Sequence, residues 1–93
     1  MIAAFVNDLQ MTQANLALAW NGLDFAALRT NSHVLIALSG TIGDRDLQAL
    51  AQNLNALAQT PNVADLLDIR SETMTKTADL IEELLGIQNS AGA

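Results

Sequence analysis

The sequence contains no cysteine and few aromatic, basic or helix-breaking residues. Without cysteine the chain can form no disulfide, no cysteine-ligated zinc site and no thiol nucleophile, and its redox compartment stays undetermined. Four Lys and Arg residues stand against ten Asp and Glu residues, which gives a formal net charge of −6. We therefore expect neither nucleic acid nor a membrane surface as a partner, because no basic patch is present to neutralise phosphates.

The single histidine, His33, excludes any site that needs two imidazoles. No metal site is expected, because Asp44 and Asp46 suit the start of a helix better than a metal ion. The longest uncharged stretch, residues 9–23, contains Gln, Asn and Thr throughout, which a bilayer-spanning helix of this length would not tolerate. No positive charge precedes Asp8, so we expect no signal peptide and a cytoplasmic protein.

The chain is rich in aliphatic residues, and they recur at helical spacing. Hydrophobic residues make up 51% of the 93 residues and aromatic residues 3%, a composition typical of a helical bundle. Apolar residues recur at three- and four-residue steps, and short breaks in this rhythm give four segments whose neighbours must run antiparallel. We predict an all-α protein, an antiparallel up-down-up-down four-helix bundle over residues 1–88, with a disordered C-terminal tail at residues 89–93.

The breaks contain residues that are typical of helix ends. Asn21-Gly22 suits a left-handed cap, and Asp24 suits the N-cap of the next helix. Two glycines permit a sharp turn at residues 39–43, and Pro61 separates the last two helices. In chain order, helices are expected over residues 2–22, 25–38, 44–57 and 63–85, with a frayed end over residues 86–93.

His33 lies midway along the second predicted helix and should point to solvent. On a helical wheel of about 100° per residue, it falls nearly opposite the leucines that face the core. An exposed histidine on a helix usually has no function. Here Ala37 and Gly40 leave a shallow, nearly bare strip beside the imidazole, and Ile36 is placed where a solvated helix prefers a charged residue. These features favour a docking surface.

Other polar residues receive structural interpretations. The wheel places Asn31 and Val34 beside the core-facing arc, where the Asn31 amide would need a hydrogen-bond partner. The acidic residues of the fourth helix are expected to form a solvated face. They are Asp65, Asp68, Glu72, Asp79, Glu82 and Glu83.

Residues 33–43 read His-Val-Leu-Ile-Ala-Leu-Ser-Gly-Thr-Ile-Gly. This stretch resembles the histidine phosphotransfer (HPt) domains of two-component phosphorelays, which carry His-x-Leu-Lys-Gly-Ser-x-x-x-hydrophobic-Gly on the second helix of a four-helix bundle. The histidine, the following leucine, the later hydrophobic residue and the final glycine all align. Residues 21–28 resemble the family's approach to this helix, and residues 47–57 resemble its third helix. The resemblance covers roughly residues 2–85.

The resemblance implies that His33 is a phosphoacceptor, which takes a phosphoryl group from an aspartyl phosphate and returns it. A neutral imidazole can serve as the nucleophile for such a step. The implied partners are a response-regulator receiver domain or a hybrid histidine kinase, and the receiver domain is expected to bring the aspartate, a lysine and Mg²⁺. The chain would then need no cofactor of its own and would be a monomeric carrier, not an enzyme with turnover.

Two departures from the family pattern matter for the chemistry. Ile36 stands where the family has lysine, and Ala37 stands where it has glycine. The family lysine is taken to lie near the phosphoryl oxygens, so Arg29, one turn before His33, is the candidate to supply the charge instead. Alanine adds only a methyl group, so access should survive, and the expected partner-docking residues are Ile36, Ala37 and Gly40.

Three alternatives compete with this interpretation. An HPt-like adaptor or scaffold could bind a signalling partner without phosphotransfer, which the missing lysine and glycine favour and the retained His33 opposes. An acyl carrier protein would match the size and acidity, but Phe25 follows Asp24 where that family needs serine. An oligomerising bundle is the third, because Thr73 and Thr77 lie on the fourth-helix stripe and could reduce its apolar burial.

Overall fold

The computed structural model describes the backbone of residues 2–60 and 62–92 and the side chains of residues 3–60 and 62–89. Over this part of the chain it contains four α-helices and no strand, which confirms the predicted all-α class. The helices are α1 (Ile2–Gly22), α2 (Phe25–Ile42), α3 (Arg45–Gln59) and α4 (Val63–Gly92). Among these described helices, none combines the length and the apolar character needed to cross a membrane.

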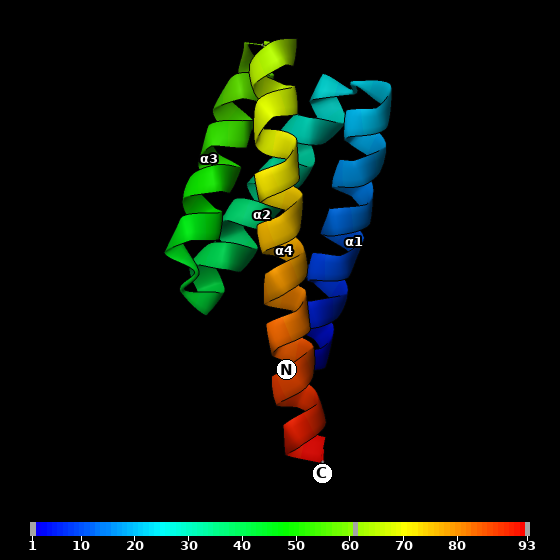
Figure 1. The fold of residues 1–93 in the computed structure, drawn as a ribbon, viewed down its shortest axis with the longest axis vertical. Helices are drawn as coiled ribbons and strands as arrows, with labels where there is room; N and C mark the ends of the chain where they lie inside the picture. The colour runs from blue at the N-terminus through cyan, green and yellow to red at the C-terminus, as the bar shows by residue number, and fades with distance from the viewer. Residues whose placement is uncertain (1, 61, 93) are drawn as a thin grey trace.

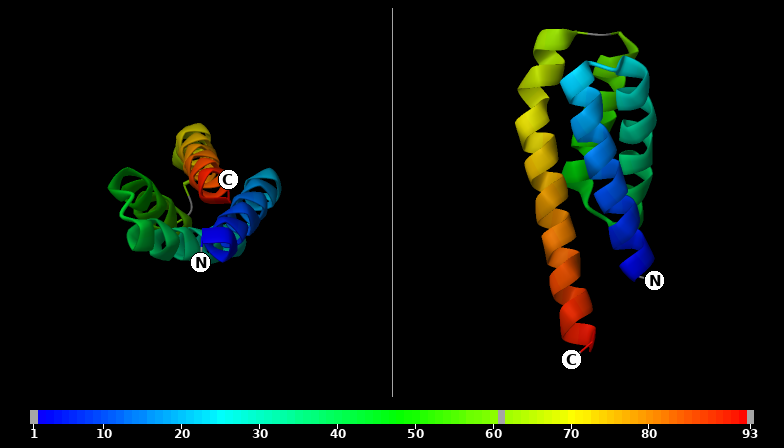
Figure 2. Two further views of the ribbon diagram at one scale, coloured as in Figure 1. Left: turned by 90° about the horizontal axis from the view of Figure 1, so that it is seen from below. Right: turned by 90° about the vertical axis from the view of Figure 1, so that its right-hand side faces the viewer.

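The helices lie around one shared core, each in contact with two others (Figure 1). Helix α1 packs against α2 and α4, and α3 packs against the same two helices. The α1–α2 and α3–α4 connections lie at one end of the molecule, and the α2–α3 connection lies toward the other (Figure 1). The C-terminal part of α4 extends past the other helices (Figure 2), so the molecule is elongated, with a longest extent of 46 Å.

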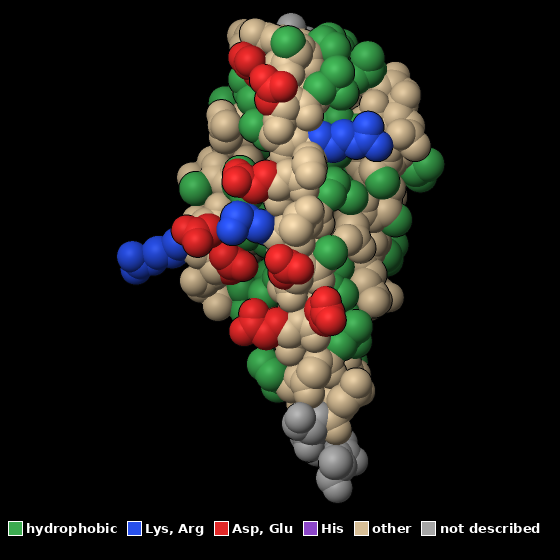
Figure 3. All heavy atoms as spheres, viewed as in Figure 1, with side chains coloured by type: hydrophobic (Ala, Val, Ile, Leu, Met, Phe, Trp, Pro, Cys, Tyr) green, Lys and Arg blue, Asp and Glu red, His purple; other side chains and the backbone are tan. Residues whose placement is uncertain are grey.

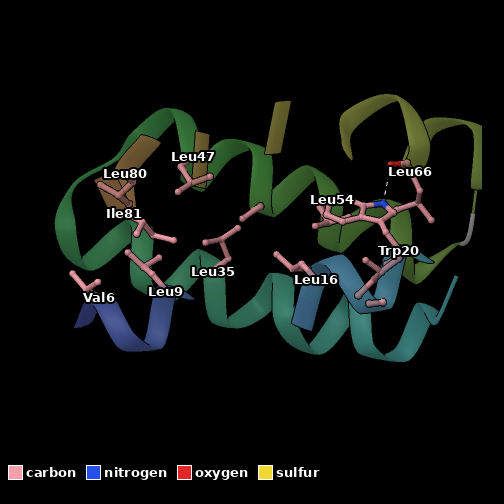
Figure 4. Packing of buried hydrophobic residues seen from close by; sticks show 14 of the residues in the cluster. Val6, Leu9, Leu16, Trp20, Leu35, Leu47, Leu54, Leu66, Leu80 and Ile81 are labelled. Atoms are coloured by element: carbon pink, nitrogen blue, oxygen red, sulfur yellow. Dashed lines mark hydrogen bonds between the residues drawn. The ribbon is translucent and has the colours of Figure 1, made fainter. Parts of the chain in front are cut away.

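The core is built mainly from leucines, with Trp20 toward one end (Figure 4). Their three- and four-residue spacing places them on one face of each helix. The Trp20 Nε1–H donates to the carbonyl oxygen of Leu66 at 3.0 Å, so this buried polar group is satisfied and α1 is joined to α4. The buried apolar residues are Val6, Leu9, Leu16, Ala19, Trp20, Leu28, Leu35, Leu47, Ala51, Leu54, Ala58, Leu66, Leu80, Ile81 and Leu84.

The connection between α1 and α2 differs from the prediction by one residue. Gly22 ends α1, but the left-handed residue is Leu23, with a φ of 47°. The Asp24 N–H reaches back to the Ala19 carbonyl at 2.8 Å, which closes the helix end. Asp24 also caps α2 as predicted, since its side chain accepts a hydrogen bond from the N–H of Ala27. Because α1 runs through Gly22, Leu23 is the first residue after the helix and takes the left-handed position of its C-terminal cap.

Helix α2 continues beyond the predicted end at residue 38 and reaches Ile42. Ser39 is buried inside the helix, where its hydroxyl donates to a carbonyl one turn before it at 2.6 Å, so it forms no turn. Gly40 is also helical, and the left-handed cap is Gly43, with a φ of 80°. Asp44 then caps α3 as predicted.

Helix α4 is longer than predicted. It was expected to fray from residue 86, but it continues as helix through Gly92. Residues 89–92 of the expected tail are therefore helical, and residue 93 lies outside the described part of the chain. Once a helix is formed, each added residue gains a backbone hydrogen bond at low cost, so Gly86 alone does not end it.

Candidate functional site

His33 is exposed midway along α2, as the wheel predicted. It lines a shallow groove of about 440 Å³ between α2 and α3. The lining residues are Arg29, Thr30, His33 and Val34 from α2, and Asn55 and Gln59 from α3. A group bound to the imidazole would therefore have side chains of both helices beside it.

Arg29 lies in this groove and is half-buried. Its Nη1 donates to the carbonyl oxygen of Ala58 at 3.1 Å, near the C-terminal end of α3. Carbonyl groups at a helix C-terminus carry partial negative charge, so a cation is favoured there. The structure thus brings Arg29 and His33 together, with one donor of the guanidinium anchored and its other N–H groups able to reach an anion.

Ile36 and Val34 take the opposite positions from those expected. Ile36 was predicted to be exposed, but it is half-buried and packs against the core. Val34 was predicted to lie beside the core-facing arc, but it is 38% exposed and lines the groove. The prediction for Ile36 was wrong because this residue shares a flank of α2 with Arg29 and Gly40, which both contact α3. A single-helix wheel does not show where the neighbouring helix lies.

Gly40 is exposed, as expected, but one side of it is covered by a residue of α3. A Cβ placed on it would come within 2.5 Å of Gln48 Nε2, so the Gln48 side chain of α3 lies directly over it. Gly40 therefore belongs to the contact between α2 and α3. Ala37 is exposed, as expected. The exposed surface of α2 around His33 also includes the small residues Ala26, Thr30 and Thr41.

A hydrogen-bonded polar cluster at the base of the groove was not identified from the sequence. Ser32 is fully buried, and its hydroxyl donates to the carbonyl oxygen of Arg29 at 3.0 Å. Asn55 Nδ2 donates to the same carbonyl and to the Ser32 hydroxyl, both at 3.1 Å. Gln59 Nε2 in turn donates to Asn55 Oδ1 at 3.2 Å. These bonds join α3 to the α2 backbone one turn before His33.

One signal in the sequence could have pointed to this cluster. Carboxamide residues recur along one flank of α3 at steps of four, three and four, namely Gln48, Gln52, Asn55 and Gln59. Such a row beside apolar positions indicates a polar contact with a neighbouring helix. Asn31, whose partner the sequence did not reveal, donates from Nδ2 to the Ala27 carbonyl in its own helix at 2.9 Å.

The charge at the groove differs from that over α4. Arg29 is the charged residue among the groove's lining residues. The six acidic residues of α4 are all exposed, and acidic side chains gather over that helix on a face where no histidine is visible (Figure 3). An anionic group that approaches His33 therefore meets a cation in a molecule whose net charge is −6.

No set of three His, Asp or Glu residues in the described part of the chain is arranged to hold a metal ion. Comparisons of the chain with models of protein families, with curated proteins and with solved structures gave no match.

Proposed function

We propose that this protein is a histidine-containing phosphotransfer protein that relays a phosphoryl group between aspartates of response-regulator receiver domains. The observation that supports this proposal is an exposed His33 in a groove that also contains Arg29. The bundle proposed for it is antiparallel and up-down-up-down, in keeping with where the connections lie in Figure 1. We propose a monomeric, cytoplasmic carrier.

The chemistry requires only the imidazole from this chain. A ring nitrogen of His33 attacks the phosphorus of an aspartyl phosphate, and the nitrogen–phosphorus bond forms as the bond from phosphorus to the carboxylate oxygen breaks. The carboxylate leaves with the electron pair, and the return transfer reverses the same step. Small exposed residues such as Thr30 and Ala37 allow the partner to approach the imidazole closely.

Arg29 is proposed to neutralise charge on the phosphoryl oxygens. Phosphoryl transfer depends mainly on positioning and electrostatic stabilisation, and Ile36 supplies no cation at the position of the family lysine. The anchoring bond to Ala58 keeps the guanidinium at the wall of the groove. Mg²⁺ and a lysine are proposed to come from the receiver domain, so this chain needs no cofactor.

The test is incubation with a phosphorylated receiver domain and Mg²⁺, followed by intact-mass measurement of this protein. The wild type should gain one acid-labile phosphoryl group, and the His33→Gln variant should gain none. Circular dichroism of both proteins controls for folding. A wild type that gains nothing from a panel of receivers, or a His33→Gln variant that gains as much as the wild type, would contradict the proposal.

An adaptor without phosphotransfer is the second candidate. The exposed side chain of Val34 favours it, because an apolar residue among small neutral ones suits contact with a protein surface. This candidate predicts that receiver domains bind wild type and His33→Gln with equal affinity while neither protein gains phosphate. Titration calorimetry beside the mass measurement separates the two functions.

A further inference from the structure

The side-chain amide of Asn55 makes its hydrogen bonds within the fold. Its Nδ2 donates to the Arg29 carbonyl and to the Ser32 hydroxyl, and its Oδ1 accepts from Gln59. Both contacts of this nitrogen lie within the fold, so the Asn55 amide is directed at α2 and not at a ligand in the groove. Asn55 therefore holds α2 and α3 together, although it lines the same groove as His33.

The bonds of Asn55 also fix the orientation of the Gln59 amide. The Arg29 carbonyl can only accept, so the nitrogen of Asn55 must face α2 and its oxygen must face Gln59. That oxygen can only accept as well, so Gln59 must present its nitrogen to it. The Gln59 nitrogen has a second N–H, and because the residue is exposed and lines the groove, this donor can reach a ligand there.

We infer that Gln59 binds an oxygen of the phosphoryl group on His33, with Asn55 as the residue that positions it; this inference rests on the proposed function. Ile36 offers no donor, and it packs against the core. Gln59 supplies a neutral donor from α3, and Arg29 supplies a cation from α2. The phosphoryl group is then held from both helices, with its negative charge shared between two kinds of donor.

The flank of α3 provides a matched control. Gln52 has the same side chain on the same helix flank, and it is exposed, but it does not line the groove. Gln48 is less suitable because it lies over Gly40. Gln52→Ala therefore removes an equivalent amide from the same helix without changing the groove.

The experiment prepares the phosphorylated protein without any receiver domain. With phosphoramidate, a ring nitrogen of His33 attacks phosphorus, the phosphorus–nitrogen bond of the reagent breaks, and ammonia leaves. The rate at which the phosphoryl group is then lost to water is followed by intact mass for wild type, Gln59→Ala, Gln59→Lys and Gln52→Ala. Side-chain amide resonances of Gln59 and Gln52 are recorded by NMR before and after phosphorylation of the wild type.

Loss of the Gln59 donor should shorten the half-life of the phosphohistidine by about threefold to tenfold. The reason is that negative charge on the phosphoryl oxygens is larger in the ground state than in a metaphosphate-like transition state, so a donor slows hydrolysis. Gln59→Lys should restore the half-life because it restores a donor, and Gln52→Ala should leave the half-life unchanged. Phosphorylation should shift the side-chain resonance of Gln59 and leave that of Gln52 in place.

An unchanged half-life in Gln59→Ala, or equal shortening in Gln52→Ala, would overturn the inference. A side-chain amide resonance of Gln59 that does not shift on phosphorylation would also overturn it. Because phosphoramidate replaces the receiver, these outcomes are read independently of the proposed relay. Normal transfer from receivers with an unchanged half-life would reject the role of Gln59 alone, whereas a Gln59-dependent half-life without any transfer would reject the relay alone.

Discussion

At the scale of single residues, Arg29 has two roles: it joins α2 to α3 by a hydrogen bond, and it supplies the positive charge in the groove. Its guanidinium donates to the Ala58 carbonyl and lines the groove with His33. Arg29→Gln removes the cation, so we predict that phosphoryl transfer from a receiver domain slows by about tenfold, as expected for the loss of a charge-assisted contact. The measurement is the rate of phosphoryl gain by intact mass.

Arg45→Gln is the matched control for this prediction. It makes the same change in net charge at an exposed position at the start of α3. If the effect of Arg29 came only from the overall field of the protein, both variants would slow transfer equally. Equal rates for the two variants would therefore contradict a local role for Arg29.

The buried hydroxyl of Thr73 determines how a substitution at this position changes stability. Its Oγ1 makes no hydrogen bond with the described residues. Valine has nearly the same shape without the hydroxyl, so Thr73→Val should raise the free energy of unfolding by about 1 kcal/mol. Urea unfolding followed by circular dichroism measures the change.

The neighbouring Thr77 is the comparison for Thr73→Val. Its hydroxyl is also buried, but it donates to the Thr73 carbonyl at 2.7 Å. Thr77→Val removes a hydrogen bond that is made, so it should not stabilise the protein to the same extent. A Thr73→Val variant that is less stable than Thr77→Val would show that the account of these two hydroxyls is wrong.

The exposure of single residues was predicted correctly from the sequence where it depended only on which side of the helix faces the core. The periodicity of α2 defines the side opposite the core, and His33 lies on it. The prediction failed for Ile36, which packs against the core, and it missed the contact of Gly40 with Gln48, because both depend on where α3 lies. The groove itself could not be predicted, since Asn55 and Gln59 reach it from another helix.

At the scale of helices, the ends were predictable where one side chain satisfies nearby backbone groups. Asp24 and Asp44 cap α2 and α3 as expected, because an N-cap is a local contact between a side chain and the next turn. The left-handed position at Leu23 was missed, because glycine was taken as the stronger signal. The far end of α4 was missed because no residue after Gly86 forces a stop.

Two glycines with different backbone conformations test these helix ends. Gly43 has a φ of 80°, so Gly43→Ala should lower the free energy of unfolding by about 1 kcal/mol. Gly86 is helical with nothing within 4 Å of an added Cβ, so Gly86→Ala should raise it by up to about 1 kcal/mol. Chemical denaturation of both variants measures the difference. If Gly86→Ala gave no gain, the continuous helix beyond residue 86 would be in doubt.

At the scale of the whole molecule, the all-helical class and the four segments followed from apolar spacing, because each helix must bury one face. The spacing of apolar residues could not predict how α2 and α3 are placed relative to each other, and this placement forms the groove. Acidic side chains gather over α4, with Lys and Arg side chains among them (Figure 3), whereas Arg29 lies beside His33 in a groove without acidic lining residues. A groove with a cation and no carboxylate suits a small carrier whose reactive residue must admit an anion.

The most direct test of the relay is donation by the phosphorylated protein. The protein is phosphorylated with phosphoramidate, freed of the reagent and mixed with an unphosphorylated receiver domain and Mg²⁺, and the intact masses of both proteins are followed. We predict that the phosphoryl group leaves His33 faster than by hydrolysis and appears on the receiver, and that a receiver whose acceptor aspartate is replaced by asparagine gains none. Release of inorganic phosphate alone, at the same rate with and without each receiver of a panel, would contradict the account.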